Sequence, residues 1–262
     1  TGVSTRHMAL FTSFYLSIAS MLSAQKPFTD ITKSSGIDHR FKVFEGLLGG
    51  GACVLDYDQD GYEDLYITSG RLEDVLYHNE RNGTFRNAFA GSGLELTNKY
   101  ITQGVSGADI NRDGWVDLFI TTINSNDSSI NNIIPRAINL LFLNNGDGTF
   151  REITAEYGLD QMYSFSTGPS FGDFNEDGYP DLYVANYFLS YEGKLSAIND
   201  AVIVASNTTA PGYLLINQKG KKLVNRFKDY GLDYKGFGFG GLPTDFDNDG
   251  DKDIFIANGH IQ

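Results

Sequence analysis

Four short stretches of the chain carry acidic side chains at a spacing suited to holding a hard divalent cation. Each stretch has Asp or Asn side chains at its first, third, fifth and ninth positions and a glycine at its sixth. Glycine suits a sharp turn at the sixth position, because it adopts positive φ without a steric penalty. These stretches, named loops 1 to 4, are residues 56–64, 109–117, 173–181 and 245–253.

The chemistry that this spacing predicts is calcium binding. Ca²⁺ takes roughly six to eight oxygen ligands from carboxylates, carbonyls and water. Positions one, three, five and nine would supply side-chain oxygens, and position seven a backbone carbonyl. The expected ligands are Asp56, Asp58, Asp60, Tyr62 and Asp64 in loop 1; Asp109, Asn111, Asp113, Trp115 and Asp117 in loop 2; Asp173, Asn175, Asp177, Tyr179 and Asp181 in loop 3; and Asp245, Asp247, Asp249, Asp251 and Asp253 in loop 4. We expect up to four Ca²⁺ ions, bound more tightly in loops 1 and 4, which have four carboxylates each at the side-chain positions.

Other metals fit the loops less well. Mg²⁺ requires a tighter octahedron and retains its waters. Zinc is disfavoured because no Cys or His is expected to join the acidic clusters, and His7, His39, His78 and His260 are scattered without metal-ligand spacing. The single cysteine, Cys53, excludes an internal disulfide and is expected to act as a small buried residue. The sequence therefore predicts oxygen-only sites.

The charge of the chain agrees with cation binding and argues against anionic partners. The formal net charge is −13, and no basic run offsets it. Nucleic acid and anionic membrane surfaces are therefore not expected partners. Much of the negative charge lies in the four loops, where bound dications would neutralise it.

The loops are positioned by a repeating set of short strands. An apolar run follows each loop, at residues 65–68, 118–121, 182–185 and 254–257, and each should be covered on both faces. The first three units continue into a hairpin. A repeating unit of four antiparallel strands is one blade of a β-propeller. The expected fold is all-β: a partial β-propeller of about three and a half four-stranded blades with calcium loops. A row of separate calcium domains is the alternative, and EF-hands rank third because the bidentate Glu at position 12 is missing.

The two ends of the chain carry different expectations. Residues 1–24 are expected to be a leader, because the apolar run 10–22 is too short to span a bilayer comfortably and ends at Ala24. An uncleaved anchor or a packed helix is the alternative. Residues 25–262 form the propeller, expected to be truncated at its C-terminus because the fourth unit ends before its outer hairpin. The mature chain is not expected to span a membrane.

The units resemble FG-GAP or VCBS repeats, the calcium-loop blades of integrin α-subunit propellers. Three features are most similar to the cartilage acidic protein group with its ASPIC/UnbV segment. They are the Phe-Thr-Asp-Ile-Thr stretch that begins at residue 28, the spacing of acidic residues in the loops, and the Leu-Phe-Leu-Asn-Asn-Gly-Asp-Gly-Thr-Phe run that ends at residue 150. The similarity covers roughly residues 28–259, without that segment or the family's full blade number. It implies an extracellular recognition scaffold and no defined reaction.

Three functional hypotheses follow. The first is a secreted or cell-surface calcium-binding propeller, periplasmic if bacterial, that acts in adhesion by recognising a protein or glycan, and is not an enzyme. Its ligand face would be formed by the long connections 123–137 and 187–212. The second is a calcium-dependent hydrolase or lyase. The third is a structural subunit that self-associates through its unfinished fourth blade.

Overall fold

The computed structural model describes residues 28–42, 49–125, 133–134, 138–163, 165–188, 191–192 and 209–261. The expected leader, residues 1–24, lies outside this range. Among the described residues, no helix is long and apolar enough to cross a membrane.

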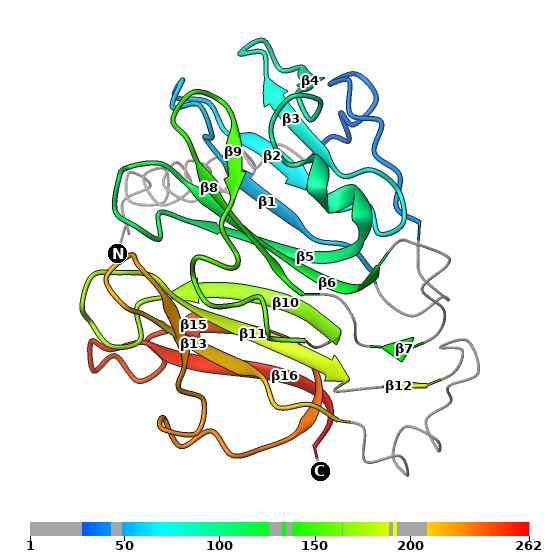
Figure 1. Ribbon diagram of the computed structural model, residues 1–262. Coiled ribbons are helices and arrows are strands. Elements are labelled where there is room, and N and C mark those ends of the chain that lie inside the picture. Colours follow the sequence, from blue (N-terminus) through cyan, green and yellow to red (C-terminus); the bar gives the residue numbers. More distant parts are fainter. Residues whose placement is uncertain are drawn as a thin grey trace, which may run out of the picture.

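The strands form three complete blades and half of a fourth, as the repeats predict (Figure 1). Blade 1 contains β1 (Ala52–Leu55), β2 (Asp64–Ile67), β3 (Val75–Asn79) and β4 (Phe85–Asn87). Blade 2 contains β5 (Tyr100–Ala108), β6 (Asp117–Ser125), β8 (Leu140–Asn144) and β9 (Phe150–Glu152). Blade 3 contains β10 (Phe165–Gly172), β11 (Asp181–Phe188), β13 (Tyr213–Asn217) and β14 (Leu223–Asn225). The half-blade contains β15 (Gly236–Thr244) and β16 (Asp253–Ile261). All neighbouring strands are antiparallel.

Three further elements lie outside these sheets. A short 3₁₀ helix, η1 (Glu95–Lys99), precedes β5. The two long connections contain β7 (Ile133–Ile134) and β12 (Tyr191–Glu192), which pair with each other. This pairing brings the described parts of the two connections together at one end of the blades (Figure 1).

The middle blade is covered on both faces by its neighbours. In β6, Leu118 and Ile120 join a core shared with blade 1, whereas Phe119 joins a core shared with blade 3. All three side chains are buried. A strand that alternates between two apolar interfaces must be apolar at every position, which explains the continuous run in the sequence.

The expectation of two covered faces is wrong for the last strand. In β16, Phe255 is 68% exposed, and Leu242 in the adjacent β15 is 61% exposed. At the other end of the row, Val54 in β1 is 62% exposed. Within the described residues, no further blade packs against these two outer faces, so their apolar positions face solvent.

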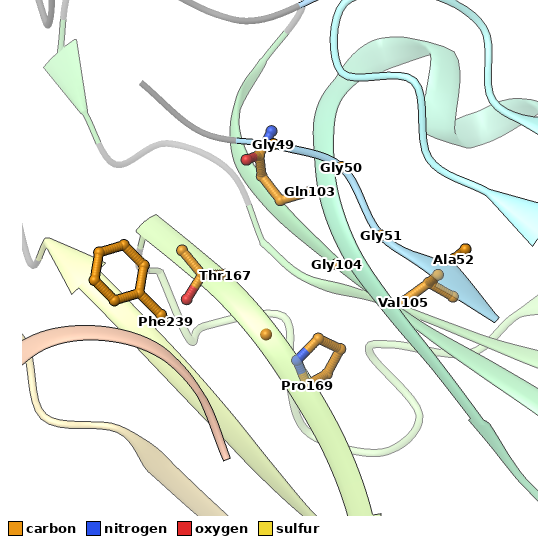
Figure 2. A pocket seen from close by; sticks show the side chains of 11 residues that line it. Gly49, Gly50, Gly51, Ala52, Gln103, Gly104, Val105, Thr167, Pro169 and Phe239 are labelled. Carbon is orange, nitrogen blue, oxygen red and sulfur yellow. The ribbon is translucent and has the colours of Figure 1, made fainter. Parts of the chain in front are cut away.

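A row of glycines lets the innermost strands approach closely. Gly51, Gly104, Gly168 and Gly240 each lie five residues before a metal loop. A Cβ at Gly104 would lie 2.3 Å from the Thr167 carbonyl oxygen of the next blade, and one at Gly168 would lie 2.5 Å from the Phe239 carbonyl oxygen. Figure 2 shows this inner region, where β1, β5, β10 and β15 surround a cavity of about 300 Å³.

Buried polar side chains also join neighbouring blades. Asp74, before β3, accepts hydrogen bonds from the Thr102 hydroxyl of blade 2 at 2.7 Å and from the Tyr66 hydroxyl at 2.7 Å. Burial raises the pKa of the Asp74 carboxyl. Asn139 takes the corresponding position before β8 and donates to the Ser166 hydroxyl of blade 3 at 2.9 Å. The two blade interfaces therefore share one geometry, with a carboxylate in the first and an amide in the second.

Candidate metal loops

All four loops occupy the same place in the fold. Each connects the first strand of its blade to the second, and its ninth residue is the first residue of that second strand. The loops therefore lie together at one end of the blades, opposite the end where β7 and β12 pair (Figure 1).

The backbone of the four loops is the same at two diagnostic positions. The glycine at position six has positive φ in every loop, between 82° and 104°, as the sequence predicts. Position four also has positive φ, between 56° and 62°, although its residues are Gln59, Arg112, Glu176 and Asn248. Positive φ is uncommon for such side chains. Because positive φ recurs at position four, all four loops share the same local backbone conformation.

The acidic side chains organise each loop by accepting backbone hydrogen bonds. In loop 2, Asp109 accepts from the N–H of Asp113 at 3.0 Å and of Gly114 at 2.8 Å. Asn111 accepts from the Asp113 N–H, and Asp113 accepts from the Trp115 N–H. Loops 1 and 3 repeat all four bonds. Three side chains thus converge on the interior of one turn, where their remaining lone pairs can take a cation.

The side chain at position nine of loops 1 to 3 is buried and ties the loop to the third strand of its blade. Asp117 accepts from the Ile110 N–H at 3.0 Å and from the Asn144 N–H at 2.9 Å, which ties the loop to β8. Asp64 and Asp181 make the same pair of bonds in blades 1 and 3. These three carboxyls are fully buried. Burial raises the pKa of Asp117 to about 7 and those of Asp64 and Asp181 to about 6, so protons compete with a cation for these carboxylates increasingly as the pH falls below 7.

The structure brings together part of each expected ligand set. The carboxylate oxygens of Asp56, Asp58 and Asp60 lie within 4.8 Å of one another in loop 1. In loop 4, those of Asp245, Asp247 and Asp253 do the same. At position seven, the N–H of Tyr62, Trp115, Tyr179 or Asp251 donates to the residue at position five. Coordination through their carbonyls stays a prediction.

One expectation about the metal donors is wrong for loop 1. His78, in β3, places its Nδ1 atom 3.4 Å from Asp58 Oδ2 and 3.5 Å from Asp64 Oδ1. The hairpin folds His78 back beside loop 1, although 13 residues separate it from Asp64. A nitrogen donor therefore does join one acidic cluster.

Neighbouring loops also contact one another. The Gln59 side-chain amide of loop 1 donates to the Gly114 carbonyl of loop 2 at 2.6 Å. The Arg112 guanidinium of loop 2 lies 5.2 Å from the centre of the Tyr179 ring of loop 3, within range of a cation–π contact. The position-four side chains of loops 1 and 2 therefore join loops 1, 2 and 3 into one row.

In blades 2 and 3, the asparagine that ends the third strand ties the blade to the loop of the preceding blade. The Asn144 amide donates to the Tyr57 carbonyl of loop 1 at 2.8 Å. The Asn217 amide donates to the Ile110 carbonyl of loop 2 at 2.8 Å. The recurrence of this asparagine after an apolar strand is the sequence signal that could have revealed the link.

Substitution of Asn144 by Ala should destabilise the chain by about 1–3 kcal/mol, because the buried Tyr57 carbonyl loses its donor. Asn79→Ala is the matched control, since the Asn79 amide bonds an exposed carbonyl within its own blade, that of Glu63. Urea unfolding of both variants measures the difference. Equal losses would show that the bond between blades adds nothing.

Comparisons with known proteins agree with this geometry. A family model for the FG-GAP-like repeat matches residues 56–120 and 109–184. Cartilage acidic protein 1 of Mus musculus is 26% identical over 218 residues, which is 80% of this chain and 29% of the relative. The Homo sapiens protein of that name is 25% identical over 212 residues, 80% of this chain and 28% of the relative. The chain thus spans less than a third of the length of these relatives.

Proposed function

We propose that this chain, which contains FG-GAP-like repeats, is part of an extracellular or cell-surface propeller that calcium stabilises and that recognises a protein or a glycan. The observation that carries the calcium assignment is the fourfold recurrence of one loop conformation, with its convergent oxygens and positive φ at positions four and six. The similarity to cartilage acidic protein 1 supports the extracellular location.

Calcium fits the donors of loops 2 and 3 in particular. Their side-chain ligands would be Asp and Asn oxygens alone, which a hard cation prefers. Bound Ca²⁺ would neutralise carboxylates that otherwise repel one another within one short turn. The protein's part is to hold these oxygens in place through the backbone bonds and the buried carboxylate of Asp117 or Asp181.

The position of the loops favours a structural role for the ion. Each loop connects two strands at the end of the blades opposite the long connections. Binding surfaces are often built from variable connections on a rigid scaffold. We therefore assign stability to the metal loops and recognition to the opposite end, where β7 and β12 pair.

Calcium titration of loop variants tests this assignment. The chain should bind up to four Ca²⁺ ions in calorimetry. Asp113→Asn in loop 2 and Asp177→Asn in loop 3 should each remove one ion or weaken one site at least tenfold, because each removes a ligand charge. Asp147→Asn is the control, since this exposed turn residue of the β8–β9 hairpin lies outside the loops. Unchanged stoichiometry and unchanged affinity in both loop variants would refute the calcium assignment.

Recognition needs a separate measurement. Arrays of glycans and of extracellular proteins, probed with and without calcium, should reveal a ligand for the intact fold. Screening the same compounds for hydrolase and lyase turnover tests the enzymatic alternative. Calcium-dependent turnover without stable binding would favour an enzyme over a recognition protein.

An exposed aromatic residue of the half-blade supports the alternative that the chain self-associates. Phe246 in loop 4 is 82% exposed, beside the exposed Phe255 of β16. Its counterpart in loop 2, Ile110, is buried because blade 3 covers it. A second copy that covers the half-blade would bury Phe246 in the same way. Light scattering decides the point, because a monodisperse monomer would exclude this assembly.

A further inference from the structure

Loop 1 differs from the other loops in having a histidine beside it. The Nδ1 atom of His78 is buried and has no hydrogen-bond partner. It faces Asp58 Oδ2 at 3.4 Å and Asp64 Oδ1 at 3.5 Å, and the three ligand atoms lie within 4.8 Å of one another. The His78 side chain is 15% exposed and that of Asp64 is fully buried.

This histidine is specific to blade 1. The corresponding residue, directly before the asparagine that ends the third strand, is Leu143 in blade 2 and Ile216 in blade 3. Both are apolar residues that strand packing alone explains. Strand packing does not explain an imidazole nitrogen placed between two carboxylates; an imidazolium paired with them or a bound metal ion does.

The surroundings hold the imidazole in position. The ring contacts Tyr57 edge to face, with ring centres 6.1 Å apart. Asp64 is held by the N–H groups of Tyr57 and Asn79, at 3.2 Å and 2.7 Å. Asp58 is less restrained, because its Oδ1 accepts one bond of 3.3 Å from Asp60 N–H while its Oδ2 faces the histidine. Two of the three donors are therefore preorganised.

Loop 1 also has less to offer calcium than its carboxylate count indicates. Asp60 accepts from the Tyr62 N–H through Oδ1, and its Oδ2 forms an ion pair with Arg81 at 2.8 Å. A nearby guanidinium and a nitrogen donor both disfavour Ca²⁺, which prefers oxygen ligands. Zn²⁺ binds imidazole nitrogen at about 2.0–2.1 Å and carboxylate oxygen at about 2.0–2.2 Å.

We infer that Asp58, Asp64 and His78 Nδ1 form a zinc site, with water as the remaining ligand, that distinguishes loop 1 from the all-oxygen loops. For bonds of about 2.1 Å, the edge of a tetrahedron is about 3.4 Å. The two distances from His78 Nδ1, 3.4 Å and 3.5 Å, match that edge. The inference refines the proposed function, since it replaces calcium by zinc in one of the four loops.

Zinc titration of the metal-stripped 262-residue chain in saturating calcium tests this site. We expect one Zn²⁺ per chain. His78→Leu, which copies the residue of blade 2, should weaken zinc binding at least tenfold and leave calcium binding by loops 2 and 3 unchanged. His39→Leu is the control, because His39 lies away from the loop and its Nε2 is 3.2 Å from the Thr68 carbonyl oxygen.

A spectroscopic readout keeps the test independent of the variant's folding. Co²⁺ in the unmodified chain should give the intense visible bands of a tetrahedral site, and Cu²⁺ should show coupling to one nitrogen in its paramagnetic resonance spectrum. Zinc affinity that survives His78→Leu, or Co²⁺ and Cu²⁺ spectra of an oxygen-only site, would overturn the inference. A chain that binds zinc through His78 but no calcium would refute the proposed function and leave this site standing.

Discussion

In excess EGTA, the chain should melt roughly 20–40 °C below its melting temperature in millimolar calcium. An ion present at a hundredfold excess over its dissociation constant stabilises the folded state by about 2.7 kcal/mol per site. Three or four such ions contribute roughly 8–11 kcal/mol, and each kcal/mol shifts the melting temperature of a domain of this size by roughly 2–4 °C.

The structural reason for this effect is that the loops close the first hairpin of every blade. Without a cation, Asp56, Asp58 and Asp60 hold their carboxylate oxygens within 4.8 Å of one another, which is unfavourable for like charges. The repulsion falls on the turn between β1 and β2. Loss of that turn would release the first two strands of the blade, and with them the face that covers the next blade.

The chelation experiment needs two controls. Melting should be measured above pH 7, because burial raises the pKa of Asp117 to about 7. At lower pH, protonation of Asp117 would relieve the repulsion among the carboxylates of loop 2 and mask the loss of the ion. Melting temperatures should recover when calcium is restored, and magnesium should restore them less. A melting curve that EGTA leaves unchanged, with metal removal verified, would show that the ions do not stabilise the fold.

The local features of the loops could be read from the sequence. A turn of nine residues is governed by short-range geometry, so the glycine at position six and the convergence of positions one, three and five follow from spacing alone. The recurrence of this pattern with apolar strands also predicted the blades. The first three blades bear this out in strand order and pairing.

The features that sequence reasoning missed depend on contacts between distant residues. His78 meets Asp58 only because β3 folds antiparallel to β2, and the register of that hairpin decides which strand residue faces the loop. The bond from Asn144 to the Tyr57 carbonyl spans 87 residues and depends on how two blades stack. The exposed faces of β15 and β16 were missed because an apolar strand is predicted to be covered whatever its neighbours are.

Two glycine-containing patterns in the sequence also resemble motifs that the structure does not form. The run from Gly236 to Gly241 resembles a dinucleotide fingerprint, and the stretch around Ser170 resembles a hydrolase elbow. Both patterns require a helix after the glycines, whereas β15 and β10 continue into metal loops. Close approach between inner strands explains the glycines before loops 1 to 3, where an added Cβ would lie within 3 Å of the neighbouring blade, whereas Gly240, before loop 4, has open space beside it.

The second large effect is therefore expected at these glycines. Gly104→Ala should cost about 3 kcal/mol or more, or prevent folding, because the added Cβ would lie 2.3 Å from the Thr167 carbonyl oxygen and 2.5 Å from Pro169 Cδ. Both atoms belong to a neighbouring backbone or a proline ring, so neither can move without shifting β10. The loss should appear in urea unfolding with calcium present.

Gly240→Ala is the matched control, because it lies at the same position relative to its loop and its Cβ would have nothing within 4 Å. Replacement of glycine by alanine at an unstrained position costs little and can stabilise by about 0.4–1 kcal/mol. Gly51→Ala should fall between the two, since its Cβ would lie 2.9 Å from Gly104 Cα. Equally small effects of Gly104→Ala and Gly240→Ala would contradict the close approach of the inner strands. If a further blade covers β15, Gly240→Ala should become as damaging as Gly104→Ala, so this variant also reports whether the open face is occupied.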